Sequence, residues 1–370
     1  MASSFGETLR VSVFGESHGT AIGAVADGLP AGETVDEAIL LDFMQRRQGG
    51  KNELSTARKE PDVPRFLSGL TDGRTNGFPL CIEIENTNTR SGDYKNLADI
   101  PRPSHADYTA YVKWNGQADL RGGGHFSGRL TAPLCAVGGV ALQILARRGI
   151  AVGAHLYSVG QTEDTPFPML PDPGLFDKIA AKKFPVINDE AGAAMQREIL
   201  AAREALDSVG GTVECVITGL PAGLGDPMFD GIENRMARAL FGIPAVKGLE
   251  FGGGFALSAM RGSRANDPFT VDENGVITTE TNHSGGVQGG ITNGMPLRFR
   301  VGFKPTPSIA QMQRSVSISE KINAALEIRG RHDPCIVQRA VPVVEAVAAL
   351  VTLDVLLSDG RFGELGTVAV

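Results

Sequence analysis

Two long apolar stretches decide the fold of this sequence: LTAPLCAVGGVALQILAR at 130–147 and VPVVEAVAALVTLDVLL at 341–357. Both are almost entirely apolar around the helical circumference, and a helix of that kind is buried on all sides. Other elements of the chain must therefore cover both helices. The sequence predicts a pair of central helices enclosed by sheets.

A glycine-rich turn upstream of each helix occurs twice. Gly28-Leu-Pro-Ala-Gly32 recurs as Gly219-Leu-Pro-Ala-Gly223. The first copy follows a strand-like segment at 9–14, and the second follows one at 211–217. A helical pattern comes after each copy, at 35–46 and at 232–241.

A second pair of turns lies further along each half. Thr75-Asn-Gly-Phe-Pro-Leu80 recurs as Thr292-Asn-Gly-Met-Pro-Leu297, and Asn-Gly favours a tight turn. Both copies run into alternating strands, at 81–85 and 298–303. The elements recur in the same order, which favours an internal repeat. The alternative is chance, because Gly, Pro and Asn turns also recur by composition.

The repeat predicts an α+β fold: one integrated β–α–β sandwich with an internal pseudo-two-fold repeat and buried central helices. Residues 1–370 then form a single domain whose halves cover about 9–147 and 211–357. The proline-rich segment at about 161–191 is predicted to be an irregular connection. A helix is predicted to follow it at 193–209.

Composition narrows the class of protein. Apolar residues make up 42% and charged residues 21% of the 370 residues, as in soluble globular proteins. The net charge of −7 argues against a general nucleic-acid binder. No apolar run reaches 18 residues and no secretory signal is visible, so a cytoplasmic protein without a membrane partner is expected. Four widely spaced cysteines suggest neither a metal site nor a disulfide framework.

Glycine is unusually frequent, with 47 residues, and many of them punctuate motifs that also carry ionisable groups. Glycine in such motifs lets the backbone approach a ligand. Five of the six histidines lie in these motifs, and His155 is most simply a strand histidine. The motifs are Gly15-Glu-Ser-His-Gly19, Arg102-Pro-Ser-His-Ala-Asp107, Arg121-Gly-Gly-Gly-His-Phe-Ser-Gly-Arg129, Asn282-His-Ser-Gly-Gly286 and Gly330-Arg-His-Asp-Pro334.

Two of these histidines are candidate proton donors, because an unperturbed imidazole titrates near neutral pH. His18 follows the first strand between glycines. Its alternative is a turn histidine bonded to the backbone. His105 stands between Arg102 and Asp107, which fits an anion site. Its alternative is a helix-cap cluster.

Basic residues beside glycine, proline or serine turns suggest a polyanionic small-molecule ligand, because guanidinium groups match carboxylates and phosphates. Arg47 ends a helical pattern, where the helix dipole alone would favour a cation. Taken singly, each of these residues could also be a solvated surface charge. The others are Arg58, Arg102, Arg121, Arg129, Lys304, Arg329 and Arg331.

Other catalytic signatures are weak. The sequence has no Walker A motif and no GxGxxG after a strand. Gly15-Glu-Ser-His-Gly19 has the spacing of a nucleophile elbow, but no helical pattern follows it directly. Paired carboxylates in a glycosidase arrangement are not indicated.

The chain resembles the chorismate synthase family over nearly its whole length. The Gly-Glu-Ser-His-Gly, Arg-Pro-x-His-Ala-Asp and Gly-Arg-His-Asp-Pro-Cys segments match family signatures as they stand. Several ordered motifs make the resemblance more specific than any single one. The further matches are Arg46-Arg47, Ala245-Val-Lys-Gly248, Asn282-His-x-Gly-Gly286 and Lys304-Pro-Thr306.

The resemblance implies a carbon–oxygen lyase of the shikimate pathway. Such enzymes convert 5-enolpyruvylshikimate 3-phosphate to chorismate and phosphate in a 1,4-elimination that needs reduced FMN. It also implies a β–α–β sandwich assembled as a homotetramer.

The resemblance assigns roles to individual residues. His18 would protonate the departing phosphate, His105 would protonate reduced flavin near N1, and Asp333 would help deprotonate flavin N5. Ser17 and Ser127 would support these groups. The expected substrate-binding residues are Arg47, Arg102 and Arg129, and the expected flavin-binding residues are His125, Phe126, Ser127, Ala245, Gly289, Lys304, Pro305, Thr306, Pro307, Ser308 and Arg331.

The sequence departs from the family pattern in two places. His125 and Phe126 replace an arginine and a serine that face the flavin, and Glu53 stands where the family usually has a basic residue. Glu53 makes NADPH doubtful even as a flavin reductant. The alternatives to a chorismate synthase are an NADPH:flavin oxidoreductase and a non-catalytic flavin- or anion-binding relative.

Overall fold

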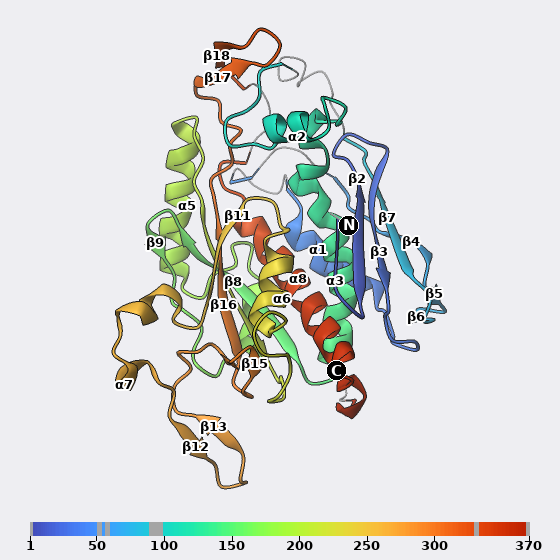
Figure 1. Ribbon diagram of the computed structural model, residues 1–370, viewed down its shortest axis with the longest axis vertical. Coiled ribbons are helices and arrows are strands. Elements are labelled where there is room, and N and C mark those ends of the chain that lie inside the picture. The colour runs from blue at the N-terminus through green and yellow to red at the C-terminus, as the bar shows by residue number, and fades with distance from the viewer. Residues whose placement is uncertain (1–2, 50–53, 56–59, 89–98, 329–332, 368–370) are drawn as a thin grey trace.

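The computed structural model describes residues 3–49, 54–55, 60–88, 99–328 and 333–367. Two five-stranded antiparallel sheets stand on either side of a layer of long helices, so the fold is α+β (Figure 1). The first sheet has the order β1-β2-β3-β7-β4, with β1 Ser4–Phe5, β2 Arg10–Gly15, β3 Ala21–Asp27, β7 Leu80–Glu85 and β4 Arg65–Ser68. The second has the order β11-β16-β10-β8-β9, with β11 Val246–Phe251, β16 Leu297–Phe303, β10 Gly211–Thr218, β8 Ala151–Val159 and β9 Thr162–Glu163.

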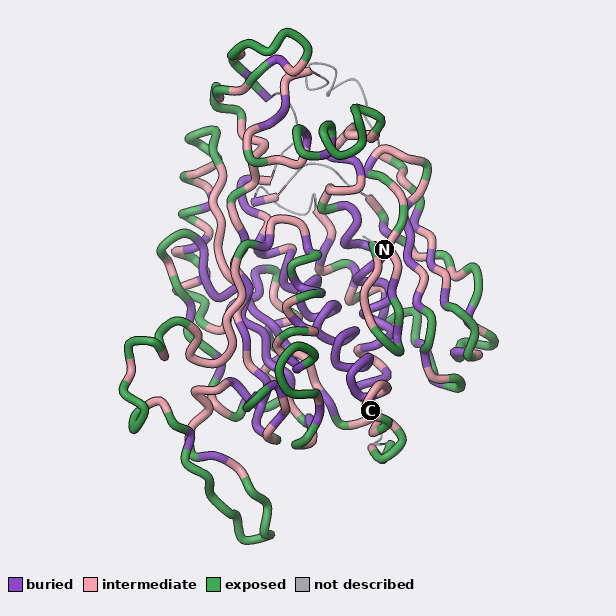
Figure 2. Tube along the Cα trace, viewed as in Figure 1, coloured by how far each residue is buried: buried purple, intermediate pink, exposed green. Residues whose placement is uncertain are grey.

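The two predicted apolar helices form the centre of the molecule. Helix α3 (Thr131–Ala146) packs on α8 (Val337–Ser358) and on the first sheet, and α8 packs on the second sheet. The approach is close, because a Cβ at Gly138 would lie 2.4 Å from the Cβ of Ala346. Nearly all buried residues join one core that runs through both sheets (Figure 2).

Both central helices are long and apolar enough to cross a membrane by composition. However, 83% of the first and 94% of the second apolar window is buried inside the protein. They are core helices. Helix α8 begins four residues before the predicted start, and Pro342 lies inside its second turn.

Shorter helices cover the edges and ends of the sheets. The remaining helices are α1 Glu37–Arg47, α2 Asp107–Lys113, α4 Pro173–Ala180, α5 Asp189–Glu204, α6 Ile232–Leu240 and α7 Gly262–Ala265. Short 3₁₀ segments are η2 Arg121–Phe126, η3 Gly128–Leu130, η4 Gly254–Ala259 and η5 Phe362–Glu364. Two-stranded ribbons pair β5 Leu70–Thr71 with β6 Arg74–Thr75, β12 Phe269–Val271 with β13 Ile277–Thr279, β14 Val287–Gln288 with β15 Ile291–Thr292, and β17 Gln313–Ser317 with β18 Ile322–Leu326.

The duplicated turns make the same hydrogen bonds in both halves. The Thr75 hydroxyl donates to the Pro30 carbonyl (2.5 Å) and accepts from the Glu33 N–H (2.9 Å). The Thr292 hydroxyl donates to the Pro221 carbonyl (2.7 Å) and accepts from the Leu224 N–H (2.9 Å). The two turn motifs of each half therefore hold one another.

Three sequence expectations need correction. The strand directly before Gly28 is β3, not the segment 9–14, which forms β2. The segment 161–191 is not wholly irregular, because it contains β9, helix α4 and the start of α5. Helix α4 forms because Asp172 caps the Gly174 N–H and Pro173 occupies the first helical position, which suits proline. Helix α5 also starts and ends earlier than the predicted 193–209.

Candidate active site

Two histidines far apart in the sequence meet at a run of three glycines. Gly122, Gly123 and Gly124 have φ of 62°, 93° and 54°, a region that side chains rarely enter. A Cβ at residue 122 would lie 2.1 Å from ring atoms of His18. A Cβ at residue 123 would lie 3.4 Å from Nε2 of His105. Bare backbone therefore separates the two rings, and only glycine fits beside His18.

The loop between β2 and β3, which carries the first histidine, is held from two sides. The N–H of the buried Ser17 donates to the Gly124 carbonyl (3.1 Å). The side-chain amide of Asn86 donates to the carbonyls of Glu16 (3.1 Å) and Gly19 (2.9 Å). Strand ends and the glycine run thus fix the position of this loop.

The second histidine belongs to a buried ion-pair cluster before α2. Nδ1 of His105 lies 2.6 Å from Oδ1 of Asp107. Arg102 donates to the same carboxylate from Nε and from Nη2, both at 2.8 Å, and its Nη2 lies 3.2 Å from His105 Nδ1. Burial would raise the pKa of Asp107, but the hydrogen bonds from Arg102 and His105 hold it well below its usual range.

Two of the predicted substrate arginines share one carboxylate. Asp62, only 2% exposed, accepts from Arg129 through Oδ1 and from Arg47 Nη1 (3.4 Å) through Oδ2. Its φ of 49° is unusual for a residue with a side chain. The Nε of Arg129 donates to the Asn86 side-chain oxygen (2.9 Å), which links this pair to the first histidine's loop.

Arg47 is poorly satisfied for a buried cation. It is 4% exposed, and its Nε has no hydrogen-bond partner among the residues that the structure describes. Burial lowers its pKa to about 10, although Asp62 acts to raise it. Arg339 lies against it and donates to its carbonyl (3.0 Å). A buried cation with an unused donor suits an anionic ligand.

The residues after β16 form another wall of the site. Lys304 Nζ donates to the Ser104 carbonyl (2.5 Å), and its backbone N–H donates to the Ala245 carbonyl (3.0 Å). Arg102 Nη1 reaches Ser308 Oγ at 3.4 Å. Burial lowers the pKa of Lys304, and repulsion from Lys247 lowers it further. The segment from Lys304 through Pro305, Thr306, Pro307 and Ser308 therefore lies beside the second histidine's loop.

The predicted base Asp333 joins this wall. The Thr306 hydroxyl donates to the Asp333 carbonyl (3.0 Å), and Arg339 Nη1 lies 2.7 Å from the Asp333 carboxylate. Arg339 thus contacts both the Asp333 carboxylate and the Arg47 carbonyl. Arg331 and Glu53, as well as Arg58 and Arg329, lie outside the described residues.

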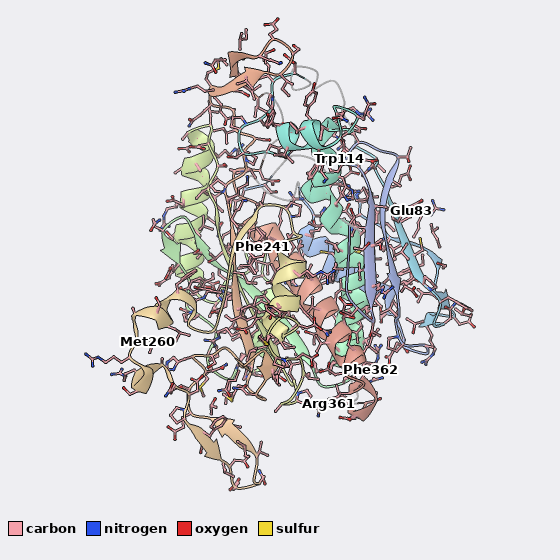
Figure 3. The ribbon with its side chains drawn as sticks, in the orientation of Figure 1. Glu83, Trp114, Phe241, Met260, Arg361 and Phe362 are labelled. Atoms are coloured by element: carbon pink, nitrogen blue, oxygen red, sulfur yellow. The ribbon has the colours of Figure 1, made fainter. Side chains whose placement is uncertain are left out.

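His125 and Phe126, the two departures from the family pattern, have partners of their own. His125 Nδ1 lies 2.8 Å from the Gly15 carbonyl, and Nε2 lies 2.9 Å from Ser3 Oγ. The ring of Phe126 lies 6.0 Å from that of Trp114 at the end of α2 (Figure 3). Both side chains connect the glycine run to neighbouring elements. Ser127 next to them caps η3 by accepting from a backbone N–H.

Gly289 lies apart from the other predicted flavin-binding residues of the same chain. It lies in the turn between β14 and β15, next to the start of α6, where the Ile232 N–H donates to the Gly290 carbonyl (2.9 Å). That turn and Lys304 flank opposite ends of β16. Figure 1 shows β15 at the end of the molecule away from α2.

Sequence reasoning missed three residues that organise the site: Asp62, Asn86 and Asp107 as the partner of His105. Asn86 and Asp62 contact groups that are distant in sequence, so spacing carries no signal for them. For Asp107 the signal was present, because it stands two residues after His105 in a quoted motif.

Together these contacts form a candidate anion site that contains two partly exposed histidines. The chain belongs to the chorismate synthase family, whose model matches residues 9–357. It is 47% identical over 353 residues to a chorismate synthase of Thermococcus kodakarensis, covering 95% of this chain and 97% of that one. It is 44% identical over 370 residues to a chorismate synthase of Lancefieldella parvula, covering 97% of each. A crystal structure of chorismate synthase matches with a TM-score of 0.77 at 28% identity, over 97% of this chain and 96% of the other.

Proposed function

We propose that this chain eliminates phosphate from 5-enolpyruvylshikimate 3-phosphate to form chorismate. The observation that carries the proposal is the pair His18 and His105 at one glycine run, beside buried arginines. The family's lyase activity on a phosphate-bearing substrate agrees with it.

The arginines account for a polyanionic substrate. Arg47 and Arg129 face one shared carboxylate, Asp62, so their combined charge is only partly balanced. A substrate phosphate or carboxylate would complete the balance and use the remaining donor of Arg47. His18, on the adjoining loop, would then donate a proton to the phosphate as charge develops on it.

The residues present also fit reduced FMN. The Lys304 ammonium has donors beyond its bond to the Ser104 carbonyl, and the Ser308 hydroxyl accepts from Arg102 and can still donate, so this segment offers donors that suit a phosphate. His105 would hold a proton beside N1 and the Asp333 carboxylate would lie beside N5. The chemistry that reduced FMN supplies in this family is transient donation of electron density to the substrate.

The experiment that tests this function is an anaerobic assay of phosphate release with reduced FMN. A chorismate synthase releases phosphate and forms chorismate in equal amounts. An NADPH:flavin oxidoreductase would reduce FMN without the shikimate substrate and leave that substrate untouched. A non-catalytic relative would bind the ligands and release no phosphate.

The source of reduced flavin is a separate part of the proposal. Glu53 places a negative charge where the family usually has a positive one, and like charges would oppose binding of the anionic NADPH. We therefore expect the chain to depend on an outside flavin reductant. Mixing enzyme, oxidised FMN and NADPH in an anaerobic stopped-flow instrument tests this, and flavin bleaching at the turnover rate would contradict it.

The proposal includes the architecture and assembly. Residues 1–370 form one domain of two structural repeats, and four copies assemble in the cytoplasm. The strand order β2-β3-β7-β4 in the first sheet corresponds to β8-β10-β16-β11 in the second. This correspondence and the equivalent Thr75 and Thr292 hydrogen bonds support the repeat. Superposing residues 9–147 on 211–357 should align both turns and both central helices. Light scattering of the purified protein tests the tetramer.

A further inference from the structure

The proton on His105 can be placed from its contacts. Its Nδ1 lies 2.6 Å from Oδ1 of Asp107. The pKa of Asp107 is held well below its usual range, so this carboxylate is ionised at neutral pH and only accepts hydrogen bonds. A contact this short therefore needs a proton on Nδ1. Arg102 Nη2 lies farther from His105 Nδ1, at 3.2 Å, and donates to the same Asp107 oxygen at 2.8 Å.

The other ring nitrogen of His105 faces the site. A Cβ at Gly123 would lie 3.4 Å from Nε2, so the missing side chain leaves this nitrogen against bare backbone. The His105 side chain keeps 16% of its surface exposed, whereas that of Asp107 keeps 4%. Nε2 is thus the nitrogen that a ligand can approach.

We propose that Asp107 is a positioning residue that keeps a proton on Nδ1 of His105, so that Nε2 alone exchanges protons with the bound ligand. The inference rests on the proposed function for the role of His105. Arg102 completes the arrangement: its two hydrogen bonds orient the carboxylate and keep it ionised. Arg102 then acts chiefly through Asp107.

The charges around His105 oppose one another. Asp107 places a negative charge at Nδ1, while Arg102 and the Lys304 ammonium, bonded to the Ser104 carbonyl, place positive charges nearby. Ser308 contributes only a neutral hydroxyl, 3.4 Å from Arg102. The short contact with Asp107 is the one that decides which ring nitrogen carries the proton.

The direct test is ¹⁵N NMR of histidine-labelled protein without ligands. The sequence has six histidines, so a His105→Gln variant identifies the His105 signals by their loss. At a pH where the His105 ring is neutral, wild-type protein should show its proton on Nδ1. A proton on Nε2 instead would overturn the proposal without any measurement of activity.

The variant Asp107→Asn sharpens the test. Arg102 needs an acceptor, so the amide oxygen should turn to Arg102 and the amide NH₂ group to His105. The neutral tautomer should then move to Nε2–H, and kcat should fall by about 10²-fold with little change in the substrate KM. An unchanged tautomer and unchanged kcat would contradict the proposal.

Two further variants separate positioning from folding. Asp107→Glu keeps a carboxylate, so it should restore the Nδ1 proton and part of kcat even if Asp107→Asn folds poorly. Asp189→Asn makes the same change in the first turn of α5, where the carboxylate is 83% exposed and pairs with Lys182. Asp189→Asn should change neither the His105 tautomer nor kcat. Full turnover in His105→Ala would sink the proposed role of His105, while the tautomer measurement would still decide the role of Asp107.

Discussion

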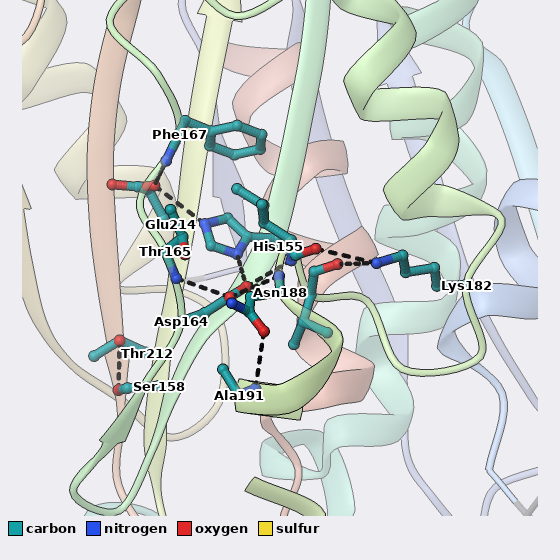
Figure 4. Close-up of polar contacts among 12 residues, drawn as sticks. His155, Ser158, Asp164, Thr165, Phe167, Lys182, Asn188, Ala191, Thr212 and Glu214 are labelled. Carbon is teal, nitrogen blue, oxygen red and sulfur yellow. Dashed lines mark hydrogen bonds and ion pairs between the residues drawn. The ribbon is translucent and has the colours of Figure 1, made fainter. Parts of the chain in front are cut away.

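Two histidine–carboxylate clusters in this molecule look alike in composition and differ in access. His105 contacts one carboxylate through Nδ1 and keeps Nε2 beside the glycine run. His155 contacts Asp164 through Nδ1 (3.0 Å) and Glu214 through Nε2 (3.1 Å), and its side chain is fully buried (Figure 4). The first can exchange a proton with a ligand, and the second cannot.

The second cluster holds the connection between the two halves. Asp164 also accepts from the backbone N–H groups of Thr165, Ile187 and Asn188, and Glu214 accepts from that of Phe167. These residues lie in the segment that precedes α5, while His155 and Glu214 lie on β8 and β10. The cluster therefore fastens an otherwise loop-rich segment to the second sheet.

The comparison shows what separates a structural histidine from a candidate proton donor. Both ring nitrogens of His155 contact carboxylates, whereas only one ring nitrogen of His105 does. Two ionised carboxylates can only accept, so both nitrogens of His155 must carry protons. Burial would lower the pKa of His155, but the hydrogen bonds to Asp164 and Glu214 raise it overall. A charged, enclosed imidazolium stabilises the fold and offers nothing to a substrate.

The largest effect is expected from His155→Phe. This change leaves Asp164 and Glu214 buried without their shared cation, and breaking a buried ion pair costs about 3–5 kcal/mol. Urea unfolding should show that loss of stability. The folded fraction should keep its specific activity.

His283→Phe is the matched control for that measurement. His283 is 34% exposed and faces a single carboxylate, Asp267, at 3.3 Å. The Asp267 carboxylate is itself buried, but without this ring it keeps hydrogen bonds from the Thr281 hydroxyl and two backbone N–H groups. The free energy of unfolding should therefore change by less than about 1 kcal/mol. Equal losses in the two variants would mean that enclosure by two carboxylates is not what matters.

The reverse pattern is expected at the glycine run. His18→Ala and His105→Ala should each lower turnover by about 10²-fold or more, the usual worth of a positioned proton donor. The unfolding free energy should change less than in His155→Phe, because Asp107 keeps Arg102 as its partner and His18 is only half-buried. Flavin and substrate titrations should still show binding, and near-normal turnover in both variants would sink the assignment.

The elements that sequence did predict depend on local pattern. The two central helices followed from uninterrupted apolar composition, and the recurring turns followed from Gly-Leu-Pro-Ala-Gly and Thr-Asn-Gly. The structure adds why the turns recur together, since Thr75 and Thr292 bond the first turn of their own half.

The contacts that sequence could not predict join residues far apart along the chain. His155 lies on a strand, as expected, but the sequence does not indicate its partner Glu214, which lies on another strand at an equally buried position. Asp62 is similar, because nothing in its neighbourhood indicates that Arg47 and Arg129 converge on it. Strand pairing brings such groups together, and a single sequence does not display that pairing.

A smaller effect is expected from the arginines that we propose bind the substrate. Arg129→Gln should raise the substrate KM by about tenfold, as one charge-assisted contact is lost. Wild-type affinity should weaken with added salt, because ions screen charges beyond about 10 Å at 0.1 M. Arg238→Gln, which removes an exposed arginine paired with Glu7, is the control. Salt-insensitive binding that is equal in all three proteins would contradict an arginine pocket.

The smallest effect is the pH dependence of stability that the enclosed histidine imposes. The pKa of His155 is raised in the folded protein above its unfolded value of about 6.5. Its stabilising contribution is therefore fully present below about pH 6.5, and it is lost as pH rises through the folded pKa. The pKa values of Asp164 and Glu214 are lowered: burial would raise them, but the hydrogen bond to His155 outweighs it, helped by backbone donors. Their contributions are present above about pH 4 and are lost in acid.

Urea unfolding of wild type and His155→Phe between pH 5.5 and 9 follows the contribution of this cluster, because the titrating groups outside it are common to both proteins. The difference in unfolding free energy should be largest at the acid end of that range. Above the folded pKa of His155 it should decline, by at most about 1.4 kcal/mol per pH unit for one proton. His283→Phe is measured alongside as the control variant. A difference that stays flat across this range would mean that His155 never loses its proton there. A difference that grows with pH would mean that the imidazole is neutral when the cluster forms.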